Sequence, residues 1–81
     1  MAIHRLKTLP EYYGAALSGE KTFELRKDDR GFRVGDVLRL MEWEDDRYTG
    51  REMSWRIKYI LRGPVYGLAV GWCILALGPT R

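Results

Sequence analysis

The segment GEKTFELRK brings several kinds of charged and polar side chain together in nine residues. Lys21, Glu24 and Arg26 supply an ammonium, a carboxylate and a guanidinium within it. Because side chains alternate along a strand, Glu24 and Arg26 would share one face, and Phe23 and Leu25 the other. The spacing predicts a polar cluster able to bind a phosphate, a nucleobase or a small polar ligand. An ordinary surface ion pair, worth about 0–1 kcal/mol, explains the same spacing.

Further basic and aromatic residues extend this candidate site. Lys27, Arg30, Arg33 and Arg39 could form a patch around the second and third strands that faces phosphate groups. Trp43 and Tyr48 flank a polar connection and could stack on unpaired bases. The alternative is that these charges belong to a solvated strand face.

Two residues near the N-terminus are also candidates. On a first strand, His4 shares a face with Leu6, and Lys7 lies on the opposite face. His4 could carry a proton near neutral pH, or it could be a structural residue. One histidine and one cysteine, Cys73, provide no metal-ligand set. We therefore expect no metal and no cofactor.

The composition indicates one globular domain over residues 1–81. Hydrophobic residues make up 46% of the chain, and its net charge is +3. Arginine outnumbers lysine, which suits planar recognition of phosphate or carboxylate. No apolar run reaches the roughly 18 residues of a membrane-spanning helix, and the N-terminus lacks a signal-peptide pattern. These features and the single cysteine predict a cytoplasmic protein with no membrane partner.

Hydrophobic periodicity and turn residues predict five strands and one helix. Strands are expected over residues 2–7, 22–27, 37–44, 51–61 and 71–77, and a helix over residues 10–18. Pro10 suits the first helical turn, and Gly19 suits the position after its end. The third strand is apolar on both faces, so it should lie inside the sheet. Trp55 and Tyr59 fall on the apolar face of the fourth strand and are predicted core residues. The regular spacing favours a small, mostly antiparallel barrel with the helix against it.

The pattern G-x-K-x-x-E-x-R, filled by Gly19, Lys21, Glu24 and Arg26, resembles the signature of the ASCH domains, a branch of the PUA-like superfamily. Other segments resemble a small ASCH-like family of bacteria and phages, the DUF3850 proteins. They are HRLK, PEYY, FELRKDDR, VGD and YTGR. This resemblance covers nearly the whole chain. It implies an α+β, mostly β fold: a five-stranded, mixed and partly open PUA-like barrel with one N-terminal helix.

The resemblance also implies a function, with alternatives. It points to binding of RNA or a nucleotide-like ligand in a cleft around Lys21, Glu24 and Arg26. Some ASCH members resemble hydrolases of modified nucleosides that use a threonine nucleophile, but Glu24 fills the comparable position here. Other ASCH members resemble ribonucleases with a Lys/Tyr/Ser set, which Lys21 with Tyr12, Tyr48 or Ser54 could imitate. The enzyme alternative is therefore hydrolysis of a modified nucleoside or of RNA, with Lys21 as its base and Glu24 as a proton carrier. A third possibility is a protein-interaction module, in which edge strands or the apolar region 65–77 form a homodimer or bind a partner.

Overall fold

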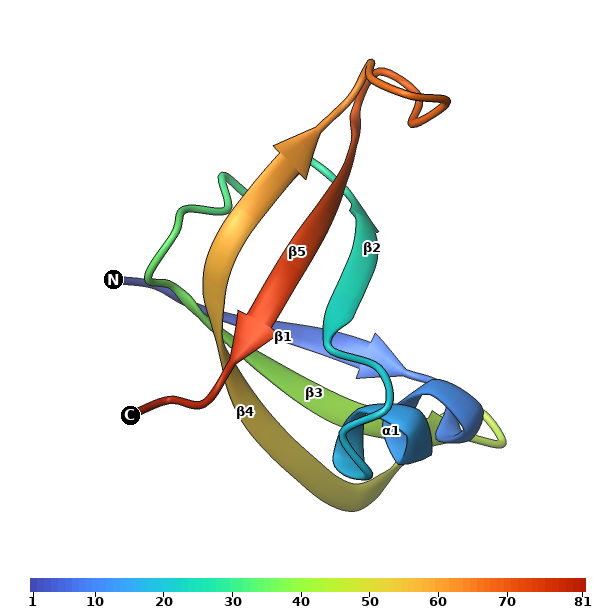
Figure 1. Ribbon diagram of the computed structural model, residues 1–81. Helices are drawn as coiled ribbons and strands as arrows, with labels where there is room; N and C mark the ends of the chain where they lie inside the picture. The colour runs from blue at the N-terminus through green and yellow to red at the C-terminus, as the bar shows by residue number, and fades with distance from the viewer.

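The computed structural model describes residues 1–81 and contains the five strands and the helix that the sequence predicts (Figure 1). In chain order the elements are β1 (Ile3–Thr8), α1 (Pro10–Leu17), β2 (Phe23–Lys27), β3 (Val37–Glu44), β4 (Arg47–Arg62) and β5 (Trp72–Gly78). Their bounds differ from the predicted ones by at most one residue, except at the start of β4.

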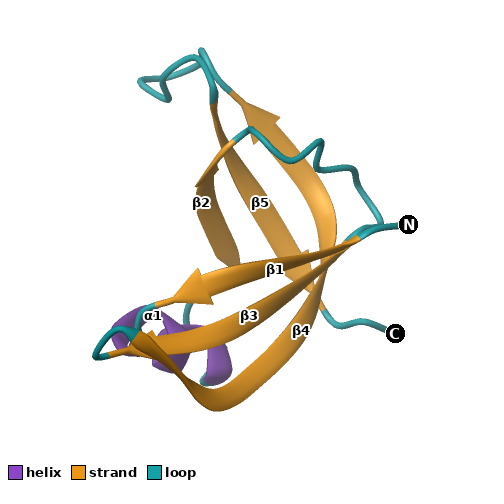
Figure 2. Cartoon of the chain, turned by 180° about the vertical axis from the view of Figure 1, so that it is seen from behind, coloured by secondary structure: helices purple, strands orange, loops and turns teal.

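All five strands form one sheet in the order β1-β3-β4-β5-β2. β1 and β3 are parallel, and the other neighbouring pairs are antiparallel. β4 is long and bent, so that it belongs to both halves of the curled sheet (Figure 2). β1 and β2 are its two edges and do not pair with each other. The result is a mixed, mostly β half-barrel with one helix, which confirms the predicted fold class and the interior position of β3.

The core is small and lies inside the curl of the sheet. It consists of Leu6, Tyr13, Ala16, Phe32, Leu38, Leu40, Ile57, Cys73, Leu75 and Leu77. The helix contributes Tyr13 and Ala16 and packs against β3. Pro10 occupies the first turn of the helix, as its fixed φ angle favours. The chain forms no helix with the length and apolar character needed to cross a bilayer.

The connection between β3 and β4 is shorter than predicted. Asp45 and Asp46 have φ angles of 52° and 60°, so they form a two-residue turn of the kind that matches strand twist. β3 therefore ends at Glu44, and β4 begins directly at Arg47. The prediction of a longer polar connection before residue 51 is wrong. Aspartate tolerates a positive φ better than most residues do, which allows the tight turn.

A bulge in β4 reverses the face that its later residues present. The register between β4 and β5 shifts between Ile57 and Tyr59. Beyond this bulge, side chains that continue the same alternation point to the opposite face of the sheet. Ile57 is buried and Ile60 packs against the core, whereas Tyr59 is 63% exposed. The prediction that Tyr59 is a core residue is therefore wrong. Trp55 precedes the bulge and packs against the core as predicted.

Candidate functional site

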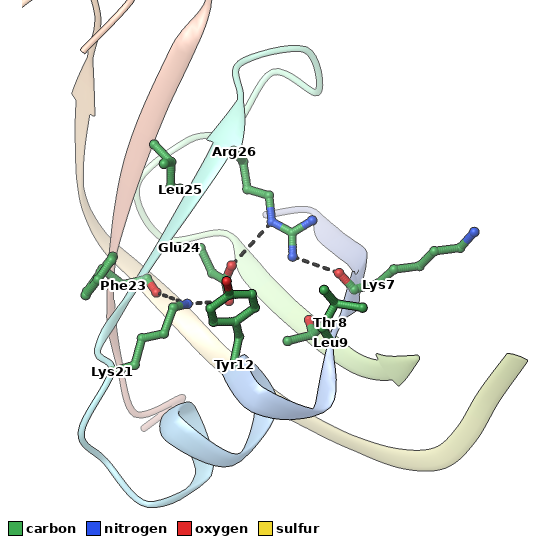
Figure 3. Close-up of a pocket in the computed structure, with 9 residues that line it drawn as sticks. All are labelled: Lys7, Thr8, Leu9, Tyr12, Lys21, Phe23, Glu24, Leu25 and Arg26. Carbon is green, nitrogen blue, oxygen red and sulfur yellow. Dashed lines mark hydrogen bonds and ion pairs between the residues drawn. The ribbon is translucent and has the colours of Figure 1, made fainter. Parts of the chain in front are cut away.

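A pocket of about 550 Å³ lies where the end of β1, the start of α1 and β2 meet (Figure 3). Its lining residues are Lys7, Thr8, Leu9, Tyr12, Lys21, Phe23, Glu24, Leu25 and Arg26. The pocket therefore contains the three charged residues that the sequence singled out. We refer to it as the first pocket.

Glu24 is the centre of the first pocket. Its side chain is only 5% exposed and accepts from two cations. Lys21 Nζ lies 3.0 Å from Oε1, and Arg26 Nε lies 3.3 Å from Oε2. Phe23 and Leu25 are 45% and 52% exposed, so the inner face of β2 is the polar one. The strand alternates as expected, but its inner face lines a pocket instead of adding to the apolar core.

The turn after α1 places Lys21 in the first pocket. Gly19 has a φ of 85°, which a residue with a side chain rarely adopts. The chain folds back there, and the Lys21 backbone N–H donates to the Ala15 carbonyl at 3.0 Å. Lys21 Nζ also donates to the Phe23 carbonyl at 2.6 Å. An ammonium has three N–H donors, so one is left for a ligand.

Arg26 connects the two edges of the sheet. Its Nη2 donates to the Lys7 carbonyl on β1 at 2.9 Å, while its Nε donates to Glu24. Its Nη1 donates to no acceptor in the chain. The first pocket has two cations and one carboxylate at its centre, which are Lys21, Arg26 and Glu24. Its surplus of positive charge and its unused donors favour an anionic ligand.

Lys27 and Arg30 line a second pocket of about 300 Å³ beside the first. Its lining residues are Leu6, Leu25, Arg26, Lys27, Asp29, Arg30, Phe32 and Trp72. Arg30 Nη1 donates to the Arg5 carbonyl on β1 at 2.8 Å. These two predicted basic residues therefore lie next to the first pocket, and they are outside it.

Lys7, Trp43 and Tyr48 form a separate cluster. The Lys7 side chain extends away from Glu24 (Figure 3), and its Nζ lies 4.0 Å from the centre of the Trp43 ring. Trp43 and Tyr48 meet edge to face, with their ring centres 4.8 Å apart. Only Lys7 belongs both to this cluster and to the lining of the first pocket. The predicted stacking residues thus contact each other and do not enter either pocket.

His4 lines neither pocket. Its Nε2 lies 2.9 Å from Asp36 Oδ2, and its ring packs edge to face on Phe32. The backbone N–H groups of Ala2 and Arg33 also donate to the Asp36 carboxylate, each at 3.0 Å. Burial acts to raise the pKa of Asp36, but these hydrogen bonds outweigh it and lower that pKa to about 2. His4 therefore belongs to a structural contact at the start of β1.

Tyr12 was considered only as a partner of Lys21 in a ribonuclease-like set, and Thr8, Leu9, Phe23 and Leu25 were not predicted to line the site. Tyr12 lies two positions after Pro10, which puts it on the first turn of α1, where it lines the first pocket with its ring centre 5.9 Å from Lys21 Nζ. The PEYY segment was a signal for this position, because it fixes where the helix begins. Phe23 was assigned to the face opposite Glu24, yet an exposed aromatic ring at the start of a strand can still border a pocket. No three His, Cys, Asp or Glu side chains gather where they could hold a metal ion.

Comparison with known proteins identifies a family for this chain but does not assign an activity to it. Over residues 3–77 the chain matches the family described as "Domain of unknown function (DUF3850)". It is 42% identical over 55 residues to the "Uncharacterized 12.9 kDa protein in GpA 3'region" of Escherichia phage P2. That alignment covers 68% of this chain and 50% of the phage protein, so the chain spans about half the length of that relative. Because the family match covers nearly all of its length, the chain belongs to the DUF3850 family.

Proposed function

We propose that the protein binds single-stranded RNA, or a nucleotide-like ligand, through the first pocket. The observation that carries this proposal is the convergence of Lys21 and Arg26 on one buried carboxylate. Both cations are held in place by the chain and keep unused N–H donors. Donors that are fixed before binding lose little side-chain entropy when a ligand arrives.

The phosphate and the base of a nucleotide each have a partner in the pocket. Arg26 and Lys21 can donate to phosphate oxygens, as guanidinium and ammonium groups commonly do. Tyr12 and Phe23 are exposed aromatic rings at its rim, and unpaired bases stack on such rings. Glu24 already accepts from both cations. Its role is therefore to orient them.

The same contacts favour binding over hydrolysis. An enzyme of this type would use Lys21 as a general base, which requires a neutral amine with a free lone pair. Lys21 instead donates to Glu24 and to the Phe23 carbonyl. In both contacts Lys21 is the hydrogen-bond donor, which is the role that the binding proposal gives it. The hydrolase alternative is tested by incubating the protein with RNA and modified nucleosides and looking for products.

The binding proposal is tested by titrating a labelled single-stranded RNA by fluorescence anisotropy. With two phosphate contacts, from Lys21 and Arg26, the single-strand salt slope gives a roughly sevenfold loss of affinity between 50 and 200 mM salt. Arg26→Gln removes a charge-assisted hydrogen bond and should weaken binding about tenfold or more. Arg33→Gln is the matched control. Arg33 is exposed, lines neither pocket and makes no side-chain hydrogen bond, so its loss should change affinity less than about twofold.

Two results would contradict the proposal. One is the absence of binding at 50 mM salt, where electrostatic attraction is strongest. The other is equal affinity of the Arg26→Gln and Arg33→Gln variants, since general charge loss would then explain the effect. Thermal melting of both variants shows whether either substitution has disturbed the fold.

A further inference from the structure

The two pockets lie along one open edge of the half-barrel. β1 and β2 are the unpaired edges of the sheet. Residues of β1 and of β2 or its flanking turns line both pockets. The pockets share the side chains of Leu25 and Arg26 as a common wall. Since Arg26 reaches across to the Lys7 carbonyl, its guanidinium stands between them.

The second pocket repeats the chemistry of the first. Besides Arg26, which lines both, the first pocket has Lys21 and Glu24 at its centre, and the second is lined by Lys27, Arg30 and Asp29. The first has Tyr12 and Phe23 at its rim, and the second has the partly exposed ring of Trp72. Each pocket therefore combines an aromatic surface with a surplus of positive charge.

Two arginines reach across to β1, and the carbonyls that they bind have a defined separation along the strand. Arg26 donates to the Lys7 carbonyl and Arg30 to the Arg5 carbonyl. These carbonyls are two residues apart on β1, which corresponds to about 7 Å along a strand. Neighbouring phosphates of an extended single strand lie at a comparable separation. Each guanidinium uses one Nη group for its carbonyl and keeps other N–H groups for a phosphate oxygen.

From this arrangement we propose that the site takes two successive nucleotides of one unpaired strand, one in each pocket. The phosphate between them binds Arg26, and the next phosphate binds Arg30. This inference rests on the proposed function, since it extends the first pocket to a two-nucleotide site. Bases of an unpaired strand can be splayed apart, which allows neighbouring bases to enter separate pockets.

The test compares a mononucleotide with dinucleotides by isothermal titration calorimetry. The probes are UMP, pUpU and UpUp, where the last two carry their terminal phosphate at opposite ends. We expect at least one dinucleotide to bind tenfold or more tightly than UMP. Arg30→Gln should reduce the affinity for that dinucleotide to within about threefold of the affinity for UMP, and it should leave UMP binding unchanged. Arg33→Gln should change neither.

A second variant keeps the test valid if Arg30→Gln disturbs the fold. Lys27 lines only the second pocket, and its side chain makes no hydrogen bond within the chain. Lys27→Gln should therefore weaken dinucleotide binding several-fold without changing UMP binding or the melting temperature. Equal affinities for UMP and both dinucleotides would overturn the two-nucleotide site and leave the proposed function standing. No binding of any probe, or of a longer RNA, would overturn both.

Discussion

At the scale of single residues, Glu24 controls the geometry of the site. Burying a carboxylate is unfavourable unless it is paired and hydrogen-bonded, and Lys21 and Arg26 meet both conditions. Replacing Glu24 leaves two cations facing each other across the pocket. The spacing of these three residues predicted either this cluster or an ordinary surface ion pair, and the family signature favoured the cluster. Short-range strand and turn geometry is what brings them together.

Lys21 and Glu24 should therefore be energetically coupled. We expect the Lys21→Met and Glu24→Gln effects to be non-additive in the double variant, with a coupling of about 0.5–3 kcal/mol. Urea denaturation measures the coupling in stability, and RNA titration measures it in affinity. The exposed pair Arg39 and Glu52 is the control, since such pairs couple by about 0–1 kcal/mol. Additive losses at Lys21 and Glu24 would mean that the two residues act independently.

At the scale of elements, the sequence predicted where strands lie better than which way they face. The alternation of apolar and polar residues in the sequence of β4 continues through Tyr59, but the bulge turns that side chain outward and Ile60 inward. For β2, alternation was right, yet nothing local showed that Glu24 faces inward. That orientation depends on β5 as the pairing partner of β2 and on the open edge beside it. Both are long-range properties of the sheet.

Truncating neighbouring residues tests the bulge. Ile60→Ala should destabilise the protein by about 2 kcal/mol, the low end for a large aliphatic side chain that packs against a core. Tyr59→Ala should change stability by no more than about 0.5 kcal/mol, as is usual for an exposed position. Chemical denaturation of both variants gives the comparison. The reverse order of effects would place Tyr59 inside and remove the bulge from the fold.

At the scale of the whole molecule, the half-barrel stays open on one side and is held together across it by side chains. Arg26 and Arg30 satisfy carbonyls on the free edge of β1, which also blocks part of that edge from pairing with another strand. A homodimer through this edge stays a prediction, as does the protein-interaction alternative. Near the N-terminus, Asp36 joins the beginning of the chain to the β2–β3 connection through Ala2, His4 and Arg33. The family resemblance pointed to the barrel, and two of its segments, HRLK and VGD, contain His4 and Asp36, but the sequence did not show that these residues pair.

Asp36 should make the stability of the whole domain dependent on acid pH. Its pKa falls from 3.8 to about 2 on folding, so its ionised form stabilises the fold at and above about pH 5. This stabilisation is lost as the pH falls through 3.8 toward 2, and a shift of this size corresponds to roughly 2 kcal/mol. The stability difference between the wild type and Asp36→Asn, measured by urea denaturation, should shrink by about that amount between pH 6 and pH 2.

The control for this prediction is Asp46→Asn. Asp46 is exposed, makes no side-chain hydrogen bond, and lies in a turn whose positive φ asparagine also tolerates. Its substitution should therefore shift stability by a small amount that does not change with pH. The comparison separates Asp36 from the other carboxylates, because both variants and the wild type share those groups. If the Asp36→Asn and wild-type curves run parallel from pH 6 to pH 2, the hydrogen bonds to Asp36 do not stabilise the half-barrel, and its acid sensitivity must arise from other carboxylates.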